Sequence, residues 1–351
     1  VKARATTERG RAAAACAAAV PMHQRSTVSY NSRDILVYAL GVGCRVPRFL
    51  WEEHPEFAPF PLFPAVLSFK GRSHGVVPYP HKELLPLMAL CGVRGVLDGE
   101  LHLEYDRPLP VPARGLSGDN GGDGGESSVT LELSTHLEGI SQKRTGAVIH
   151  LHSELYDTDC HRICTMRTAL FAVGASGYSR SDETREHAPA AARDWTRVRS
   201  ERVAEAVYTE TIGEHISKLY RLSGDYNPIH IDDETAQAHG LDGAVMHGRC
   251  TMAFGVRAVL DTFAHGDPSA LSAAAARFAS PVPLGSTLVT RMWRETRPTP
   301  VQPVRSSPER ACTSRVYFET EVKESGRLAL THAWIDVLTS SSTAMLGQSR
   351  L

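Results

Sequence analysis

The sequence predicts an α+β protein of two successive units, each an antiparallel sheet wrapped around a central helix. Its 351 residues, 42% of them hydrophobic, are enough for two domains of ordinary size. In the second half a long helical pattern precedes three strand patterns, and the first half shows the same order loosely. The expected organisation is a leader over 1–25, units over 26–178 and 198–340, a linker over 179–197 and a tail over 341–351.

The first unit is expected to begin with a short helix. Asn31 and Asp34 have the spacing of a helix cap, and the apolar residues that follow stop at Gly41–Gly43. Alternating, β-branched segments then predict four strands, at residues 101–105, 129–133, 147–155 and 163–173. The Gly/Asp/Ser stretch 115–128 predicts a loop, and no phosphate-binding GxxxxGK[ST] pattern follows it.

The second unit is expected to centre on a buried helix that begins at Gly248. Its apolar residues recur at helical spacing: Met252, Val256, Val259, Leu260 and Phe263. Three strands are predicted after it, at residues 284–295, 316–323 and 327–338, with a hairpin at Ser325–Gly326 and a Pro/Ser/Arg-rich excursion over 297–313.

The bulk composition indicates which kinds of partner and which cellular compartment to expect. A net charge of −1 and a pI near 7.0 offer no overall field for nucleic acid or an anionic membrane. Seven cysteines without a CxxC pair fit a reducing compartment. The chain contains no run of about 18 apolar residues, so no transmembrane helix is expected.

The two ends of the chain carry separate expectations. Residues 1–25 are rich in Ala and Arg and start at Val1, so they are expected to be a disordered leader. The last residues, Ser349-Arg350-Leu351, match the small-basic-Leu pattern of a peroxisomal address. Peroxisomal location is therefore expected, with a mitochondrial or cytosolic location as the alternative.

The stretch Leu222–Ile231 carries the strongest chemical signal in the chain. It places an acid (Asp225), an amide (Asn227) and an imidazole (His230) within six residues around a forced turn. Pro228 fixes its own φ and keeps the preceding residue out of the helical region, so the loop can aim the acid and the imidazole into one cavity. The arrangement suits activation of water.

Structural roles and metal binding are the alternatives for these residues. An isolated Asp in such a sequence is most often a turn former and an isolated His a core residue, while His247 can serve only to shape the entry of the next helix. Four residues close in sequence could ligate zinc but lack the spacing of a preformed site: His230, Asp232, His239 and His247. No metal and no cofactor are expected.

Residues 220–231 (YRLSGDYNPIHI) and 245–251 (VMHGRCT) resemble the signature of MaoC-like (R)-specific enoyl-CoA hydratases. The resemblance extends in order over roughly residues 26–338. It implies a double hotdog fold, an N-terminal half that accommodates the acyl chain, a C-terminal half that holds the catalytic loop, and a homodimer.

The resemblance also implies roles for individual residues. Asp225 and His230 divide the proton transfers of water addition, and Asn227 helps to hold the water. The backbone N–H of Gly248, at a helix N-terminus, donates to the thioester oxygen, where negative charge develops.

Substrate contacts are expected at Tyr226, Pro228, Ile229, Phe278, Gly99 and Lys143. Lys143 matches a family lysine and suits a phosphate of coenzyme A. The family's His-Gly pair falls on Asp98-Gly99, so this chain departs from the family there, with an acid in place of the histidine.

The expected function is reversible hydration of trans-2-enoyl-CoA to (3R)-3-hydroxyacyl-CoA in fatty acid β-oxidation. Two alternatives remain at this point: an (R)-3-hydroxyacyl-carrier-protein dehydratase that uses the same residues, and a non-catalytic module that binds acyl-CoA. The expected partner is an acyl-CoA substrate, with no nucleic acid and no membrane span.

Overall fold

The computed structural model describes residues 23–81, 87, 92–113, 127–176, 190–296 and 312–338. Its strands form one sheet in the order β1-β3-β4-β5-β2-β7-β10-β9-β8-β6, with every neighbouring pair antiparallel. The first five strands are β1 (His23–Asn31), β2 (Gly95–Tyr105), β3 (Ser128–Lys143), β4 (Gly146–Tyr156) and β5 (Arg162–Val173). The second five are β6 (Ala206–Thr211), β7 (Leu271–Phe278), β8 (Thr287–Thr296), β9 (Cys312–Val322) and β10 (Arg327–Leu338).

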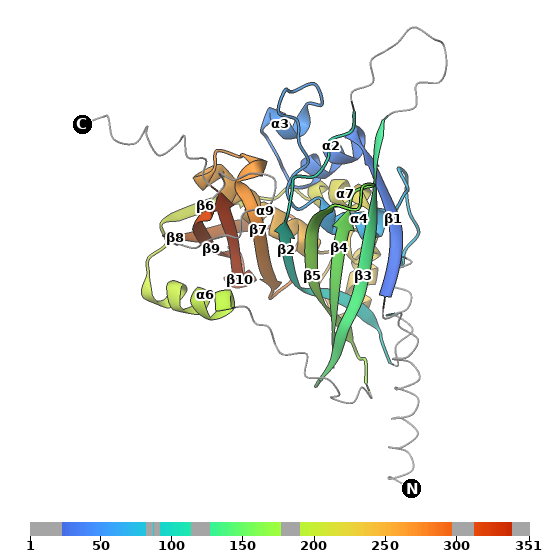
Figure 1. The fold of residues 1–351 in the computed structure, drawn as a ribbon. Coiled ribbons are helices and arrows are strands. Elements are labelled where there is room, and N and C mark those ends of the chain that lie inside the picture. Colours follow the sequence, from blue (N-terminus) through green and yellow to red (C-terminus); the bar gives the residue numbers. More distant parts are fainter. Residues whose placement is uncertain are drawn as a thin grey trace, which may run out of the picture.

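The sheet therefore consists of two halves, each made by one half of the chain, joined where β2 pairs with β7 (Figure 1). The helices of the first half are α2 (Ser32–Gly41), α3 (Pro47–Leu50) and α4 (Pro64–Lys70). Those of the second half are α6 (Ala190–Glu201), α7 (His215–Tyr220), α8 (Asp233–Ala238) and α9 (Gly248–Phe263). Short 3-10 turns are η1 (Arg221–Ser223), η2 (Pro228–His230) and η3 (Pro268–Ala270).

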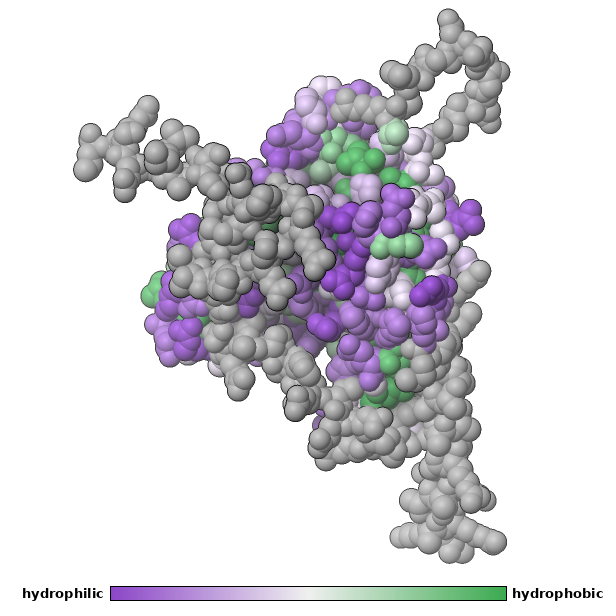
Figure 2. Space-filling model, in the orientation of Figure 1, coloured by the Kyte–Doolittle hydropathy of each residue, from purple (hydrophilic) through white to green (hydrophobic). Residues whose placement is uncertain are grey.

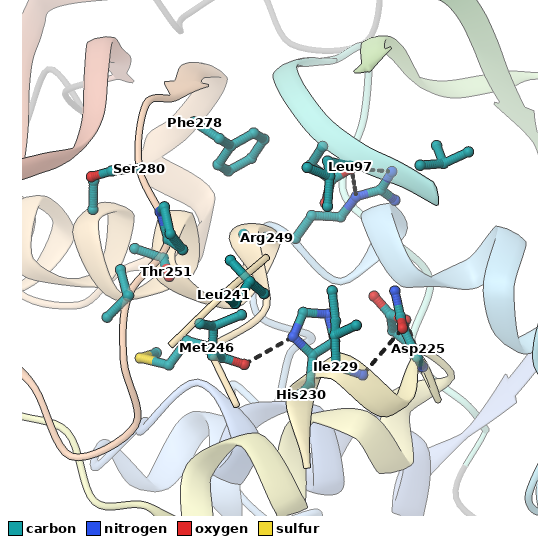
Figure 3. A pocket seen from close by; sticks show the side chains of 18 of the residues that line it. Leu97, Asp225, Ile229, His230, Leu241, Met246, Arg249, Thr251, Phe278 and Ser280 are labelled. Carbon is teal, nitrogen blue, oxygen red and sulfur yellow. Dashed lines mark hydrogen bonds and ion pairs between the residues drawn. The ribbon is translucent and has the colours of Figure 1, made fainter. Parts of the chain in front are cut away.

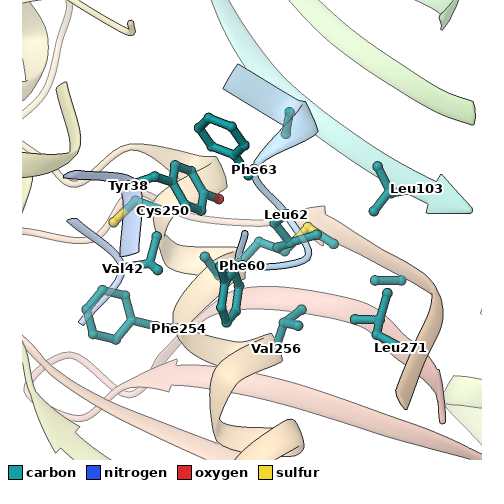
Figure 4. Packing of buried hydrophobic residues seen from close by; sticks show 14 of the residues in the cluster. Tyr38, Val42, Phe60, Leu62, Phe63, Leu103, Cys250, Phe254, Val256 and Leu271 are labelled. Carbon is teal, nitrogen blue, oxygen red and sulfur yellow. The ribbon is translucent and has the colours of Figure 1, made fainter. Parts of the chain in front are cut away.

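One large hydrophobic cluster spans the two units. Side chains of the first unit such as Tyr38 and Phe60 belong to the same buried cluster as Cys250, Phe254 and Val256 of α9 (Figure 4). Burying apolar area at about 25 cal/mol per Å² is the main favourable term in folding, so the units stabilise one another. This shared core fixes α9 relative to β2 across the junction.

Close packing explains a glycine in the middle of α9. A Cβ atom at Gly255 would lie 2.7 Å from the ring of Phe318 on β9, closer than two carbon atoms can approach. The absence of a side chain lets the helix approach the concave face of the sheet. On the opposite face α6 packs through Trp195, which donates a 2.8 Å hydrogen bond from Nε1 to the Phe318 carbonyl.

Several predicted elements are confirmed. Helix α2 begins at the expected capping box, in which Asp34 N donates to Asn31 Oδ1 and Asn31 N donates to Asp34 Oδ2, both at 3.0 Å. The helix over 248–263 and the strands at the predicted positions are present, most of the strands longer than expected. The hairpin between β9 and β10 has Gly326 in the left-handed region, with φ of +65°.

Two predicted boundaries were wrong. Residues 23–25, assigned to the leader, form the start of β1 and pair with Ser134–His136 of β3. Residues 190–197, assigned to the linker, belong to α6, because Trp195 and Val198 provide an apolar face that covers the sheet. The rest of the leader, the remainder of the linker, residues 115–126 and 297–311 of the predicted loops, and the tail lie outside the described residues.

Figure 2 shows how polar and apolar residues are distributed on one face of the molecule. On the face shown in Figure 2 the described surface is mainly hydrophilic, with hydrophobic areas scattered between the polar ones. Among the described helices, none has the length and apolar character needed to cross a bilayer.

Candidate active site

A cavity of about 260 Å³ opens where the two units meet. The first unit contributes Asp98 and its strand neighbours on β2, and the second contributes the loop around Asp225 and the start of α9. In Figure 3 Asp225, Ile229 and His230 lie on one side of this space, with Phe278 and Arg249 across it. The cavity therefore brings together residues that are far apart in the sequence.

The loop between α7 and α8 is shaped by its own sequence. Gly224 has a φ of +128°, and a Cβ there would lie 2.8 Å from the backbone nitrogen of Lys70, so only glycine fits this turn. The Asn227 side chain then caps η2, since its Oδ1 accepts from Ile229 N at 3.3 Å, and Pro228 occupies the first position of that turn. As the spacing predicted, Asp225, Asn227 and His230 all line the cavity.

His230 is held as a neutral base. Its Nδ1 lies 2.9 Å from the carbonyl oxygen of Val245, which can only accept, so Nδ1 carries the proton and Nε2 keeps its lone pair. Burial lowers the pKa of His230 below its ordinary value, although the nearby Asp225 carboxylate opposes this. The residue is 7% exposed, so at neutral pH the cavity contains an unprotonated imidazole nitrogen.

Asp225 is held as an anion. Its Oδ1 accepts a 3.3 Å hydrogen bond from Asn227 N and lies 3.7 Å from Nε2 of His81. Burial acts to raise the pKa of this carboxyl, but the His81 imidazole and the charges that His247 and His230 carry when protonated outweigh it, so the pKa falls below its ordinary value. The site therefore pairs a carboxylate with a neutral imidazole, and their polar atoms lie within 4.8 Å of one another.

His247 joins the catalytic loop to the start of α9. It is 1% exposed, and its Nε2 donates to the backbone carbonyl of Asp225 at 3.1 Å. Its ring stacks on that of His230 with centroids 3.7 Å apart. Burial lowers the pKa of His247 to about 3, so this ring is neutral at physiological pH. These contacts fit the structural role that the sequence left open for it.

Gly248 opens α9 directly beside the two bases. His247 is the N-cap, so the backbone N–H of Gly248 is one of the helix's first donors and lies at the positive end of its dipole. A Cβ at Gly248 would lie 3.3 Å from the Phe278 ring and 3.5 Å from the Asp98 Cβ. The missing side chain leaves room for a substrate group to approach this donor.

Residues 197–307 match the family model described as "MaoC like domain". The chain carries a MaoC-like domain. The acid, the amide, the imidazole and the helix start described above all fall within the matched residues.

Two sequence relatives are similar to this chain over nearly its whole length. Peroxisomal multifunctional enzyme type 2 of Mus musculus is 30% identical over 323 residues, which cover 90% of this chain and 37% of the mouse protein. Enoyl-CoA hydratase 2, peroxisomal, of Arabidopsis thaliana is 27% identical over 327 residues, covering 90% of this chain and 92% of the plant protein. The chain thus spans well under half of the mouse relative.

Solved structures agree with the arrangement of the sheet. A MaoC-like dehydratase from Phytophthora capsici superposes with a TM-score of 0.68 at 28% identity, covering 92% of this chain and 96% of that chain. A Mycobacterium tuberculosis protein described as having a double hotdog fold has a TM-score of 0.53 at 13% identity, covering 91% and 96%. The expected double hotdog fold is confirmed, with the MaoC-like domain in its second half.

The structure places two of the six predicted substrate contacts in the cavity wall and the other four outside it. Ile229 and Phe278 line the cavity. Tyr226 is buried below the Arg221 guanidinium, which lies 4.7 Å above its ring, and it does not line the cavity. The remaining three described residues also lie outside the cavity wall: Pro228 within η2, Gly99 at a bulge in β2, and Lys143 at the exposed end of β3.

Two residues beside Asp225 were not found from the sequence. His81, from the first unit, is 3% exposed and stacks on Phe69, and neither of its ring nitrogens has a hydrogen-bond partner among the described residues. Tyr79 lines the cavity, where burial and the charge of Asp225 raise its pKa to about 12. Only the fold brings these residues to Asp225, and no local pattern marks them.

The geometry limits which of the proposed zinc ligands could bind an ion together. Of the four zinc candidates, Asp232 and His239 instead make hydrogen bonds with Thr235 in α8. Ligand atoms of Asp225, His230 and His247 do lie within 4.8 Å of one another, so these three side chains could hold an ion. The two stacked rings each direct one nitrogen to a backbone carbonyl, which leaves one nitrogen of each for such a role.

Proposed function

We propose that this chain catalyses the reversible addition of water to trans-2-enoyl-CoA, giving (3R)-3-hydroxyacyl-CoA. The observation that carries the proposal is the Val245 carbonyl, which fixes His230 with its Nε2 unprotonated beside an ionised Asp225 in one cavity. The name of the Arabidopsis relative, 92% of which the chain spans, supports the same reaction. A non-catalytic module has no need of this constellation.

The protonation states suggest where the two protons of the reaction travel. Neither His230 nor Asp225 carries an acidic proton at neutral pH, so neither can donate to the α carbon at the outset. His230 Nε2 takes a proton from water as the water oxygen bonds to the β carbon. The resulting imidazolium, stabilised by the Asp225 carboxylate, then delivers the same proton to the α carbon. Both new bonds form on one face, which is syn addition.

The remaining residues would orient the reactants. The Asn227 amide nitrogen makes no hydrogen bond within the described residues and lines the cavity, so it is available to hold the water. The Gly248 N–H is placed to receive the thioester oxygen as it becomes negative, and losing such a donor costs about 3 kcal/mol in the transition state.

The cellular setting is also part of the proposal. We propose β-oxidation in the peroxisome, which the names of the mouse and Arabidopsis relatives support. We also propose a homodimer, testable by light scattering of the full chain.

The test is a hydration assay with matched substrates. The purified protein should remove the absorbance of the conjugated thioester, and His230→Ala should lose nearly all of that rate. His239→Ala is the control, because His239 lies outside the cavity and contacts α8. Ligand-stabilised melting without turnover would indicate a binding module instead, and faster turnover of the carrier-protein thioester than of the CoA ester would indicate a dehydratase of fatty acid synthesis.

A further inference from the structure

A buried ion pair forms part of the cavity wall. Arg249 follows Gly248 on α9 and donates from Nε and Nη2 to one oxygen of Asp98, Oδ1, at 3.2 and 3.1 Å. Its Nη1 donates to the Ala65 carbonyl, and its guanidinium lies 4.5 Å above the Phe69 ring. The side chains are 9% and 18% exposed, so both charges are largely withdrawn from water.

The second carboxylate oxygen of Asp98 has a different environment. Oδ2 accepts no hydrogen bond from any residue that the structure describes, although Asp98 lines the cavity. The surrounding wall is apolar. Leu97 precedes Asp98 on β2, and Leu170 on β5 is the cross-strand partner of Asp98. Phe278 lies against Gly248 at the start of α9. An unpartnered acceptor is thus set among side chains that suit an acyl chain.

We propose that Asp98, held by Arg249, makes this cavity selective for 2-enoyl thioesters whose acyl part carries a hydroxyl group. A plain alkyl chain at this wall removes water from Oδ2 without replacing the hydrogen bond, which is unfavourable. A hydroxyl group on the acyl chain donates to Oδ2 and so replaces the hydrogen bond lost with the water. A carbonyl or ether oxygen has no proton to donate, and a carboxylate is repelled by the Asp98 charge.

The inference rests on the proposed hydration, so its test compares two substrates of that reaction. One substrate is a trans-2-enoyl-CoA ester with a single hydroxyl group, placed in turn at each carbon beyond the double bond. The other is the unsubstituted ester of equal length. The measured quantity is the ratio of kcat/KM for the hydroxylated and the plain ester. We expect the best hydroxylated ester to be favoured about tenfold or more in the wild type.

Two variants test the origin of the preference. In Asp98→Leu/Arg249→Met both charges are removed together, because either single truncation leaves a buried charge unpaired. Its ratio should fall to about one. Asp98→Asn keeps an oxygen for Arg249 and replaces Oδ2 with an N–H donor, which a keto oxygen and a hydroxyl oxygen can both accept from, so the discrimination against a keto-substituted ester should be lost.

A second ion pair in the chain provides the matched control. Arg315 donates from Nε and Nη2 to Asp336, both at 2.5 Å, and packs 3.8 Å above the Trp334 ring, away from the cavity. Arg315→Met/Asp336→Leu should change stability but leave the substrate ratio at its wild-type value.

The outcomes separate this inference from the function on which it rests. Hydration of both esters with no preference in the wild type, or a preference for the hydroxylated ester that Asp98→Leu/Arg249→Met leaves unchanged, overturns the proposal while hydration stands. An equal loss on every ester in the Asp98 variants also overturns it, since Asp98 would then contact a group common to all thioesters. Turnover of no ester overturns the hydratase assignment and this inference with it.

Discussion

Replacing Asp225 with Asn removes one charge from the site and little else. The amide has the shape of the carboxylate and can still accept the hydrogen bond from Asn227 N. In the proposed reaction His230 becomes cationic after it takes a proton from water. The variant therefore measures how much the Asp225 charge stabilises that cation.

The size of the effect follows from the distance between the two groups. Polar atoms of Asp225 and His230 lie within 4.8 Å of each other, and both side chains are largely buried. Two unit charges at that distance interact by about 3.5 kcal/mol at an effective dielectric constant of about 20. Losing this interaction in the transition state lowers kcat/KM about 300-fold.

The assay is the initial rate of hydration as a function of pH. Because the Asp225 charge raises the pKa of His230, the acid limb of kcat/KM should also move to lower pH in Asp225→Asn. Asp232→Asn is the matched control, since Asp232 caps α8 through Thr235 N at 2.8 Å and faces away from the cavity. Retention of the wild-type rate within a factor of about three by Asp225→Asn would refute the reasoning.

Three further predictions concern the same site. The pKa of His247 is about 3 in the folded protein, against an ordinary value of 6.5. As the pH falls below 6.5, the unfolded chain therefore binds more protons than the folded protein, and the free energy of unfolding decreases. Urea denaturation should show the wild type losing about 2 kcal/mol more than His247→Gln between pH 7 and pH 5, and equal losses would contradict the burial argument. Gly248→Ala should fold normally but lose about tenfold in kcat/KM, because the new methyl would meet the Phe278 ring at 3.3 Å and displace the reacting groups; an unchanged rate would contradict the need for free space at this position. Exhaustive chelation should leave hydration intact, whereas loss of activity that zinc restores would reassign Asp225, His230 and His247 as ligands.

The elements that the sequence predicted are those whose cause is local. Asn31 and Asp34 cap α2 through side chains three residues apart, and Asn227 with Pro228 fixes η2 within one turn. The long helix after Gly248 follows from its apolar spacing. Such signals depend on neighbours along the chain, so they can be recognised without knowledge of the fold.

Elements whose cause is tertiary were missed. Strand β7 includes four consecutive alanines, Ala273–Ala276, which have low strand propensity. They form a strand because β7 joins β2 to β10, and the small side chains allow α6 and α9 to pack closely on opposite faces. Helix α6 was likewise hidden, because its polar residues outnumber the apolar ones that cover the sheet.

The same distinction applies to the site. The three loop residues and Gly248 could be found from their spacing, but Asp98 and Arg249 are 151 positions apart. His81 reaches Asp225 only because both units share one core. A contact of this kind leaves no trace in a single sequence.

The measurement that tests the central claim most directly is the stereochemical course of hydration in D₂O. The wild-type protein is given a trans-2-enoyl-CoA, and the configuration of the product at both new centres is determined by NMR. If His230 takes the proton and returns it beside Asp225, the product is the 3R alcohol with deuterium at the α carbon on the same face as the hydroxyl. Anti addition would contradict the account, because it needs a proton donor on the opposite side of the substrate.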